Sequence, residues 1–304
     1  MRFSGIYTPV ITPFAPDGRI DFGAYQTQVQ YLVSAGVQGL VIGGTTGEYY
    51  VESHQERIDL LVAAKEVCGQ VPVVFGTGSI NPEHSVALAE AGAAAGADAL
   101  LVATPPYVLP TQRELATHVL TITRAADLPV MLYNYPDRMG VNMEAAFFDR
   151  VGRSSQICAI KESSGDINRL HMLARDYPHI QTSCGMDDQA LEFFAWGAQS
   201  WVCAGSNFLP AEHIALYQAC VLQNDFALGR RIMMAMLPLM HVLEQGGKFI
   251  QSVKYGVTLD GRKGGGVRPP LRELNKDDKR ALEQVISTLK TTIAALQHQP
   301  AAQH

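Results

Sequence analysis

A unit of helix end, glycine and apolar strand recurs along the chain, and this repeat most constrains the fold. The unit is clearest at residues 35–42, 95–102 and 196–203. In each copy a glycine follows a helical pattern, and a short link leads into an apolar run. A glycine just past a helix end accepts the left-handed conformation that closes the helix. Buried strands that alternate with helices indicate parallel pairing with helical crossovers.

The same pattern extends over most of the chain and gives eight candidate strands. They lie near residues 4–11, 38–43, 72–77, 98–103, 129–134, 156–161, 180–184 and 200–204. Helical patterns fill the gaps, for instance at residues 22–35, 53–67, 82–95 and 209–222. Eight strand–helix units close most economically into a barrel. We therefore predict an α/β fold, a (β/α)8 TIM barrel that forms a catalytic domain over residues 1–224.

An open doubly wound sheet is the alternative architecture, but no Gly-x-Gly-x-x-Gly follows the first strand. Beyond residue 224 the strand pattern stops, and residues 226–244, 249–257 and 276–296 are helical in pattern. We predict a C-terminal helical extension over residues 225–297 and a disordered tail over residues 298–304. No Lys-Ser/Thr follows Gly264-Gly265-Gly266, so this triplet is predicted to be a connector and not a phosphate loop.

Composition narrows the class of partner. The chain has 304 residues, with 24 Lys and Arg against 29 Asp and Glu, and the charges form no blocks. This argues against nucleic acid or an anionic membrane surface as a partner. The five cysteines form no Cys-x-x-Cys pair, which suits a reducing cytoplasm. The first residues lack the pattern of a signal peptide, and no continuous apolar run approaches the roughly 20 residues of a membrane span. We expect a cytoplasmic protein that acts on a small molecule.

Lys161 is the first candidate for catalysis, because it ends the apolar strand predicted at residues 156–161. Burial disfavours the ammonium form of a lysine, so the amine can become a neutral nucleophile that forms a Schiff base with a carbonyl group. A lysine at a strand end more commonly reaches into solvent. The ends of the other predicted strands decide between these interpretations.

Catalytic groups of such barrels lie at the carboxyl ends of the strands. Chemically useful residues follow four other strands, at residues 43–48, 104–107, 133–138 and 185–188. Backbone N–H groups around Thr45 and Thr46 can hold a carboxylate. Tyr133 can pass a proton, and the planar fork of Arg138 suits a second carboxylate. Each residue alone has an ordinary structural explanation, but their occurrence at matching strand ends predicts one site.

A metal centre is not predicted. His54, His84, His118 and His171 fall in helical patterns, and none forms a His-x-His pair. Clustered histidine or carboxylate ligands are what a catalytic metal requires. A metal-dependent aldolase is therefore disfavoured.

Three motifs together resemble a known family. They are Gly44-Thr45-Thr46-Gly47-Glu48, Tyr133-Asn134-x-Pro136-x-Arg138 and Ile160-Lys161-Glu162-x-x-Gly165. Over nearly its whole length the chain is similar to the dihydrodipicolinate synthase / N-acetylneuraminate lyase family. The resemblance implies a class I lyase in which Lys161 forms the Schiff base with pyruvate or a longer 2-oxo acid, with no cofactor.

The same resemblance implies roles for the other residues. Tyr133, Thr45 and Tyr107 would form a proton relay, with Tyr107 donated by a neighbouring subunit. Thr45 and Thr46 would hold the carboxylate of the 2-oxo acid. Arg138 is the further candidate for substrate binding, through the second carboxylate that its planar fork suits. Members of the family are commonly homotetramers built as dimers of dimers, so we expect a homo-oligomer.

The particular reaction stays open. Arg138 with Thr45, Tyr107 and Tyr133 favours a synthase, yet Pro106-Tyr107 replaces the paired tyrosines of lysine-regulated synthases, which predicts no strong feedback by lysine. Tyr49-Tyr50 stands where synthases often have small residues near the second substrate. The continuation after Lys161 resembles paralogues that act on 2-keto-3-deoxy sugar acids or hydroxypyrroline carboxylate, as aldolases, dehydratases or deaminases. A non-enzymatic regulatory paralogue is disfavoured because Lys161 and Tyr133 are both present.

Overall fold

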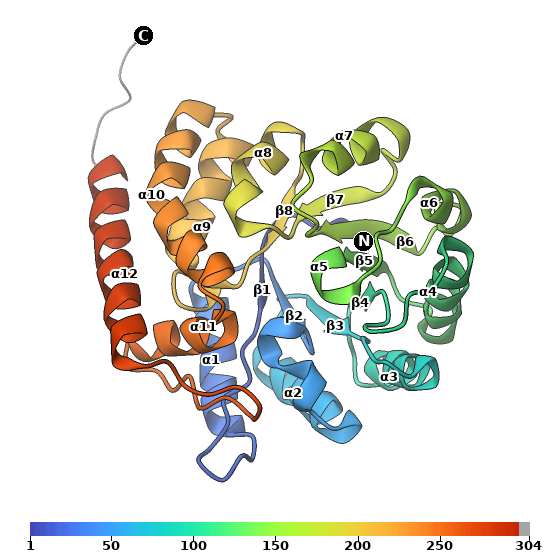
Figure 1. Cartoon of the computed structure of the whole chain (residues 1–304), viewed down its shortest axis with the longest axis horizontal. Helices are drawn as coiled ribbons and strands as arrows, with labels where there is room; N and C mark the ends of the chain where they lie inside the picture. The colour runs from blue at the N-terminus through green and yellow to red at the C-terminus, as the bar shows by residue number, and fades with distance from the viewer. Residues whose placement is uncertain (298–304) are drawn as a thin grey trace.

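A computed structural model describes residues 1–297 and shows a closed barrel of eight strands (Figure 1). Every strand pairs in parallel with its neighbours, and β1 pairs with β8 to close the barrel. The strands are β1 (Gly5–Pro9), β2 (Gly39–Ile42), β3 (Val73–Gly76), β4 (Ala99–Ala103), β5 (Val130–Asn134), β6 (Ile157–Glu162), β7 (Gln181–Cys184) and β8 (Ser200–Val202). The predicted TIM barrel is confirmed, and every strand end lies within two residues of its predicted position.

Helices surround the barrel (Figure 1). They are α1 (Phe22–Ser34), α2 (His54–Val67), α3 (Pro82–Ala94), α4 (Gln112–Ala126), α5 (Pro136–Met139), α6 (Ala145–Val151), α7 (Ile167–Asp176), α8 (Ala190–Ala195), α9 (Pro210–Tyr217), α10 (Phe226–Gln245), α11 (Phe249–Thr258) and α12 (Lys276–Gln297). The helix predicted at residues 209–222 is interrupted, because a π-helical turn over Gln218–Leu222 follows α9. The last three helices form the predicted C-terminal helical part.

The glycines of the repeated unit have the conformation that the repeat predicts. Gly36, Gly96 and Gly197 have φ angles of +85°, +86° and +88°. A Cβ atom on Gly36 or Gly197 would meet no atom within 4 Å, so space does not require glycine there. The left-handed backbone does, since side chains with a Cβ are disfavoured in it. Each glycine ends its helix and turns the chain back into the next strand.

Two apolar layers hold the barrel. One fills its interior and includes Tyr7, Val41, Val74, Leu101, Met131, Ala159 and Val202. The other lies between strands and helices and includes large side chains such as Tyr25, Phe75, Phe147, Phe148 and Trp201. The barrel is therefore a packed core and not a pore. Its carboxyl end is the surface left for a site.

The extension packs on the barrel through α10, which contacts α8, α9, α11 and α12. By length and hydropathy alone α10 is the one helix within residues 1–297 that could cross a membrane. Core helices of soluble proteins meet the same criteria, and α10 buries one face on its neighbours and contains Pro238. The tail predicted at residues 298–304 lies outside the described residues. The division into a barrel at 1–224 and an extension at 225–297 stays a prediction.

Candidate active site

Strand register places Tyr133 and Lys161 side by side at the carboxyl end of the barrel. They are directly paired residues of β5 and β6. Paired residues on neighbouring parallel strands point to the same face, which here is the barrel interior. The Lys161 Nζ atom lies 4.3 Å from the centroid of the Tyr133 ring. The two residues that the sequence predicts to act together are therefore in contact distance.

Both residues line a narrow cavity of about 40 Å³, which has room for a molecule of a few heavy atoms. Thr45, Thr46 and Arg138 also line it, so five of the six predicted site residues meet there. The other lining residues are Pro9, Val41, Gly44, Leu101, Tyr135, Gly185, Asp187, Val202, Ala204, Glu244 and Phe249. The cavity is thus built from strand ends around the barrel, from the end of α10 at Glu244 and from the start of α11 at Phe249.

Gly185 makes room for the lysine side chain. A Cβ atom at this position would lie 2.7 Å from Lys161 Cγ and 2.1 Å from the Ser163 hydroxyl oxygen. Contacts this short force atoms apart in a packed interior. The Ser163 hydroxyl in turn donates to the Gly185 carbonyl at 2.9 Å. A glycine after β7 is therefore required for Lys161 to pass into the cavity.

The surroundings of Lys161 favour the neutral amine. Desolvation by the packed protein around it lowers its pKa from the ordinary lysine value of 10.5, and the negative charges of Asp187 and Glu244 act in the opposite direction. Desolvation is the largest of these influences, so the pKa is lowered on balance. A lysine in this state is a better nucleophile than a solvated one at the same pH.

Tyr133 is held in its protonated form. Burial raises the pKa of its phenol, and a hydrogen bond with the Thr45 side chain partly offsets this rise. The hydroxyl therefore carries a proton at neutral pH that it can donate and recover. Thr45 connects the phenol to the turn after β2, as a relay requires.

The turn at Thr45–Gly47 presents backbone donors to the cavity. Its internal hydrogen bonds run from Gly47 N–H to Gly44 C=O at 3.1 Å and from Glu48 N–H to Thr45 C=O at 3.0 Å. The N–H groups of Thr45 and Thr46 precede the first of these bonds and are not used within the turn. Such successive N–H groups form a concave site for an anion.

Glu48, the residue that follows this turn, connects it to the C-terminal extension. Its φ angle is +65°, its side chain is fully buried, and its carboxylate forms an ion pair with Lys254 of α11. The backbone N–H of Arg268 donates to the same carboxylate at 3.1 Å. The extension therefore fixes the turn that carries Thr45 and Thr46.

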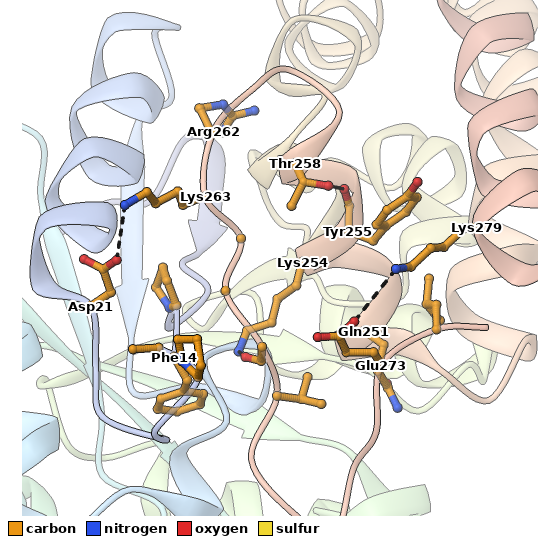
Figure 2. A pocket seen from close by; sticks show the side chains of 18 residues that line it. Phe14, Asp21, Gln251, Lys254, Tyr255, Thr258, Arg262, Lys263, Glu273 and Lys279 are labelled. Atoms are coloured by element: carbon orange, nitrogen blue, oxygen red, sulfur yellow. Dashed lines mark hydrogen bonds and ion pairs between the residues drawn. The ribbon is translucent and has the colours of Figure 1, made fainter. Parts of the chain in front are cut away.

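A larger cavity, of about 620 Å³, lies where α11 and the Gly264–Gly266 loop meet residues 13–21 (Figure 2). Lys254 extends from α11 into it, and its side chain is buried (Figure 2). Its amine, however, lies 4.4 Å from the centre of the Phe14 ring and donates to the Gly266 carbonyl at 2.5 Å, besides pairing with Glu48. These partners occupy the amine, so this cavity offers no comparable nucleophile.

Tyr107 is the one predicted site residue that the structure does not bring to the cavity. It has a φ angle of +75° and its side chain is 88% exposed. Within one chain the predicted proton relay is therefore incomplete. The exposed position allows the ring to reach another copy of the chain, which is the arrangement that the family resemblance implies.

Two carboxylates in the cavity are absent from the predicted site. Asp187 follows β7 and accepts a hydrogen bond from Trp201 Nε1 at 2.8 Å, and burial raises its pKa to about 8. Its position just after β7 is the sequence feature that could have identified it as a site residue. Glu244 lies on α10, outside every strand end, so no barrel rule pointed to it. Tyr49 and Tyr50, which the sequence suggested near the second substrate, do not line the cavity, although the charge of Arg138 acts on both.

Comparison with known proteins agrees with this geometry. The sequence model of the Dihydrodipicolinate synthetase family matches residues 2–289, nearly the whole described chain. The chain belongs to this family. It is therefore a lyase of the family, and the predicted family and enzyme class are confirmed.

Individual relatives support the same assignment. A protein of Exiguobacterium sibiricum named 4-hydroxy-tetrahydrodipicolinate synthase is 37% identical over 79% of this chain and 83% of its own length. The structure of the 4-hydroxy-tetrahydrodipicolinate synthase of Methylacidiphilum fumariolicum SolV matches with a TM-score of 0.91 at 28% identity, over 98% of this chain and 99% of that one. YagE, a prophage protein of the family from E. coli K12 solved in complex with pyruvate, matches with a TM-score of 0.87 at 29% identity, over 95% and 99%.

Proposed function

We propose that the protein is a dihydrodipicolinate synthase-like lyase in which Lys161 forms a Schiff base with pyruvate or a longer 2-oxo acid. The observation that carries the proposal is the desolvated Lys161 amine beside the Tyr133 phenol, in a cavity with room for a molecule of a few heavy atoms. A neutral amine, a proton donor and an anion site are what imine formation with a 2-oxo acid requires. The names of the relatives and the pyruvate bound by YagE support the same substrate class.

The turn at Thr45–Gly47 would orient the substrate. Its unused N–H groups at Thr45 and Thr46 receive the carboxylate, and this places the neighbouring 2-oxo carbon toward Lys161. Val41, Leu101 and Val202 form apolar walls in the same cavity. A short acid is therefore held by its charged end while its carbonyl meets the amine.

The steps follow from these positions. The Lys161 nitrogen adds to C2, and the carbonyl oxygen takes a proton from Tyr133, which regains one through Thr45. The proton that returns to Tyr133 is the one that the added nitrogen gives up, and a second transfer from Tyr133 lets the oxygen leave as water, which gives the iminium ion. The Tyr133 phenolate then takes a C3 proton, which gives an enamine with the iminium as the electron sink. The enamine carbon adds to an aldehyde in synthesis, or it results from C3–C4 cleavage in the reverse direction. Hydrolysis of the imine returns free Lys161.

Arg138 would contact the second substrate. It extends from α5, next to the end of β5, and its guanidinium lies 5.3 Å from the centre of the Tyr135 ring at the cavity. A guanidinium stacked on an aromatic ring keeps its donors directed for a carboxylate. The aldehyde partner or the far end of a longer acid would therefore be anionic or polar at this side.

We propose that the active form is a homotetramer, a dimer of dimers, because Tyr107 does not reach the cavity of its own chain. A neighbouring copy would insert this tyrosine and complete the relay. The five cysteines are free, and four of them are buried. Free thiols of this kind suit the reducing cytoplasm, where we place the enzyme.

Reductive trapping tests the proposal. Incubation with pyruvate and borohydride should add one reduced pyruvyl group to each chain, and peptide mapping should place it on Lys161. Lys254 is the internal control, because it is buried yet occupied by Glu48 and the Gly266 carbonyl. An adduct confined to Lys254 or to surface lysines would contradict the proposal. A folded sample that traps neither pyruvate nor a longer 2-oxo acid would overturn it.

A further inference from the structure

Glu244 and Asp187 are the two acidic residues that line the cavity and have no part in the proposed steps. Glu244 lies one residue before the end of α10 and lines the same cavity as Lys161 and Arg138. Within residues 1–297 its carboxylate makes no direct hydrogen bond or ion pair. It is half-buried, and Lys161, Asp188 and Arg138 all act on it electrostatically. Glu244 is thus an open acceptor facing the reaction space.

Helix stability does not explain a glutamate at this position. The carboxyl end of a helix carries a partial negative charge, so an acidic side chain there is unfavourable. The last turn of α10 holds no basic residue to offset this charge. Burial, the leading influence, raises the pKa of Glu244, as expected for a carboxylate that loses water without gaining a fixed partner. A glutamate at this position lowers the stability of the folded protein, and this indicates a role in binding a ligand.

The chemical groups of a bound substrate determine whether the Glu244 carboxylate has a hydrogen-bond donor. When a ligand displaces water, a carboxylate left without a donor pays a desolvation penalty. A hydroxyl or ammonium group on the ligand removes that penalty, a methyl group does not, and a second carboxylate adds repulsion. Arg138 has the opposite preference and attracts the carboxylate.

We propose that Glu244 is a specificity-determining residue that accepts a hydrogen bond from a hydroxyl or ammonium group on the substrate carbon beyond C3. The inference rests on the proposed Schiff-base function and deepens it by naming the far-end chemistry of the substrate. Arg138 and Glu244 together select compounds with a hydrogen-bond donor on one side and an anionic or neutral polar group on the other. Longer 2-oxo acids with an unsubstituted aliphatic chain are selected against, whereas pyruvate, which has no carbon beyond C3, is not affected.

The test is borohydride trapping of matched 2-oxo acids by the whole protein. 2-Oxopentanoate, 4-hydroxy-2-oxobutanoate and 4-amino-2-oxobutanoate differ only in a methyl, hydroxyl or ammonium group at one position. The half-saturating concentration of each is measured on wild type, Glu244→Leu and Glu244→Gln, and mass identifies the adduct as intact or cleaved to pyruvyl. Pyruvate is trapped in parallel. If neither pyruvate nor any of the three acids is trapped, the proposed Schiff-base function is contradicted, and the role of Glu244 is not what failed.

Wild type should half-saturate with the hydroxyl or ammonium acid at a concentration about 10- to 100-fold below that for 2-oxopentanoate, the value of a hydrogen bond to a charged group. Glu244→Leu should abolish this preference. Glu244→Gln keeps an acceptor oxygen but no charge, so it should retain preference for a hydroxyl and lose preference for an ammonium, which distinguishes the two donors. 2-Oxoglutarate should bind more tightly to Glu244→Leu, because repulsion is removed.

Glu273 provides the matched control, since it lines the other cavity, near α12, and pairs there with Lys279 at 3.8 Å. Glu273→Leu should leave every ratio as in wild type. Pyruvate trapping and the oligomeric state show whether each variant is folded. Equal binding of the methyl, hydroxyl and ammonium acids by wild type, or an unchanged preference in Glu244→Leu, would overturn the inference.

Discussion

Glu48 and Lys254 form a fully buried ion pair that joins the turn after β2 to α11 of the extension. The two residues lie 206 positions apart (254 minus 48). Glu48 is the last residue of the motif that holds Thr45 and Thr46, and its backbone is left-handed. The extension is therefore coupled to the turn that carries Thr45 and Thr46.

Breaking this pair should destabilise the protein and weaken substrate binding. Lys254→Met leaves the Glu48 carboxylate buried and unpaired, which costs about 3–5 kcal/mol. Denaturant unfolding measures the loss, and the concentration of pyruvate that half-saturates trapping should rise because the turn loosens. Arg280→Ala is the control, since Arg280 and Asp277 form an exposed pair worth about 0.2–1 kcal/mol. Equal losses in the two variants would contradict the coupling.

Lys161→Ala should abolish turnover and trapping while the protein stays folded. The side chain ends in the cavity, and its removal leaves the barrel layers intact. Circular dichroism and the oligomeric state serve as controls. A variant with wild-type turnover would exclude Lys161 as the nucleophile.

Tyr133→Phe should slow imine formation roughly 10²–10⁴-fold, the usual effect of a lost proton-transfer group. The ring stays in place, so packing is preserved. Tyr135→Phe is the matched variant, because its ring lies 5.9 Å from that of Tyr133 and also lines the cavity. We expect a smaller loss there. Rapid-quench trapping gives both rates, and equal rates for Tyr133→Phe and wild type would remove Tyr133 from the relay.

The rate of adduct formation should rise with pH through the lowered pKa of Lys161, since only the neutral amine attacks. The midpoint should fall below 10.5, the value of an unperturbed lysine. Ionised Asp187 raises the pKa of Lys161, so Asp187→Asn should move the midpoint to lower pH. The asparagine oxygen can still accept from Trp201 Nε1. Initial rates across pH measure the shift, and a midpoint that moves upward would contradict the assigned influence.

Mixing two inactive variants tests the origin of Tyr107. Tyr107→Phe lacks the relay tyrosine and Lys161→Ala lacks the nucleophile. In a mixed dimer that exchanges Tyr107, one of the two sites is complete. Random reassembly makes half of the dimers mixed, so roughly a quarter of wild-type activity should return. Activity no greater than that of the separate variants would show that Tyr107 is not donated in this way.

Local sequence was sufficient for the elements of the barrel. Gly36, Gly96 and Gly197 marked helix ends because only glycine takes their backbone conformation without strain. Apolar runs between such ends could be placed as strands to within a few residues. The break after Tyr217 was missed, because the apolar pattern continues unchanged through the π-helical turn.

The rule that functional residues follow the carboxyl ends of barrel strands was sufficient to predict most of the residues that meet at the cavity. Thr45, Thr46, Tyr133, Arg138 and Lys161 converge since parallel strands of a closed barrel share one carboxyl end. Glu244 could not be found in this way, because its place depends on how α10 packs across the barrel. Tyr49 and Tyr50 do not line the cavity, but the charge of Arg138 acts on both, so their influence on the second substrate stays a prediction.

The sequence by itself therefore determined the barrel, its order of strands and the strand ends that carry Tyr133 and Lys161, since all three depend on periodicity and on residues next to one another in the chain. Tertiary structure alone decided three further points. It paired Glu48 with Lys254, directed Glu244 at the cavity and left Tyr107 outside it. Contacts between residues far apart in the chain arise from the packing of whole helices and strands, and no local pattern records them.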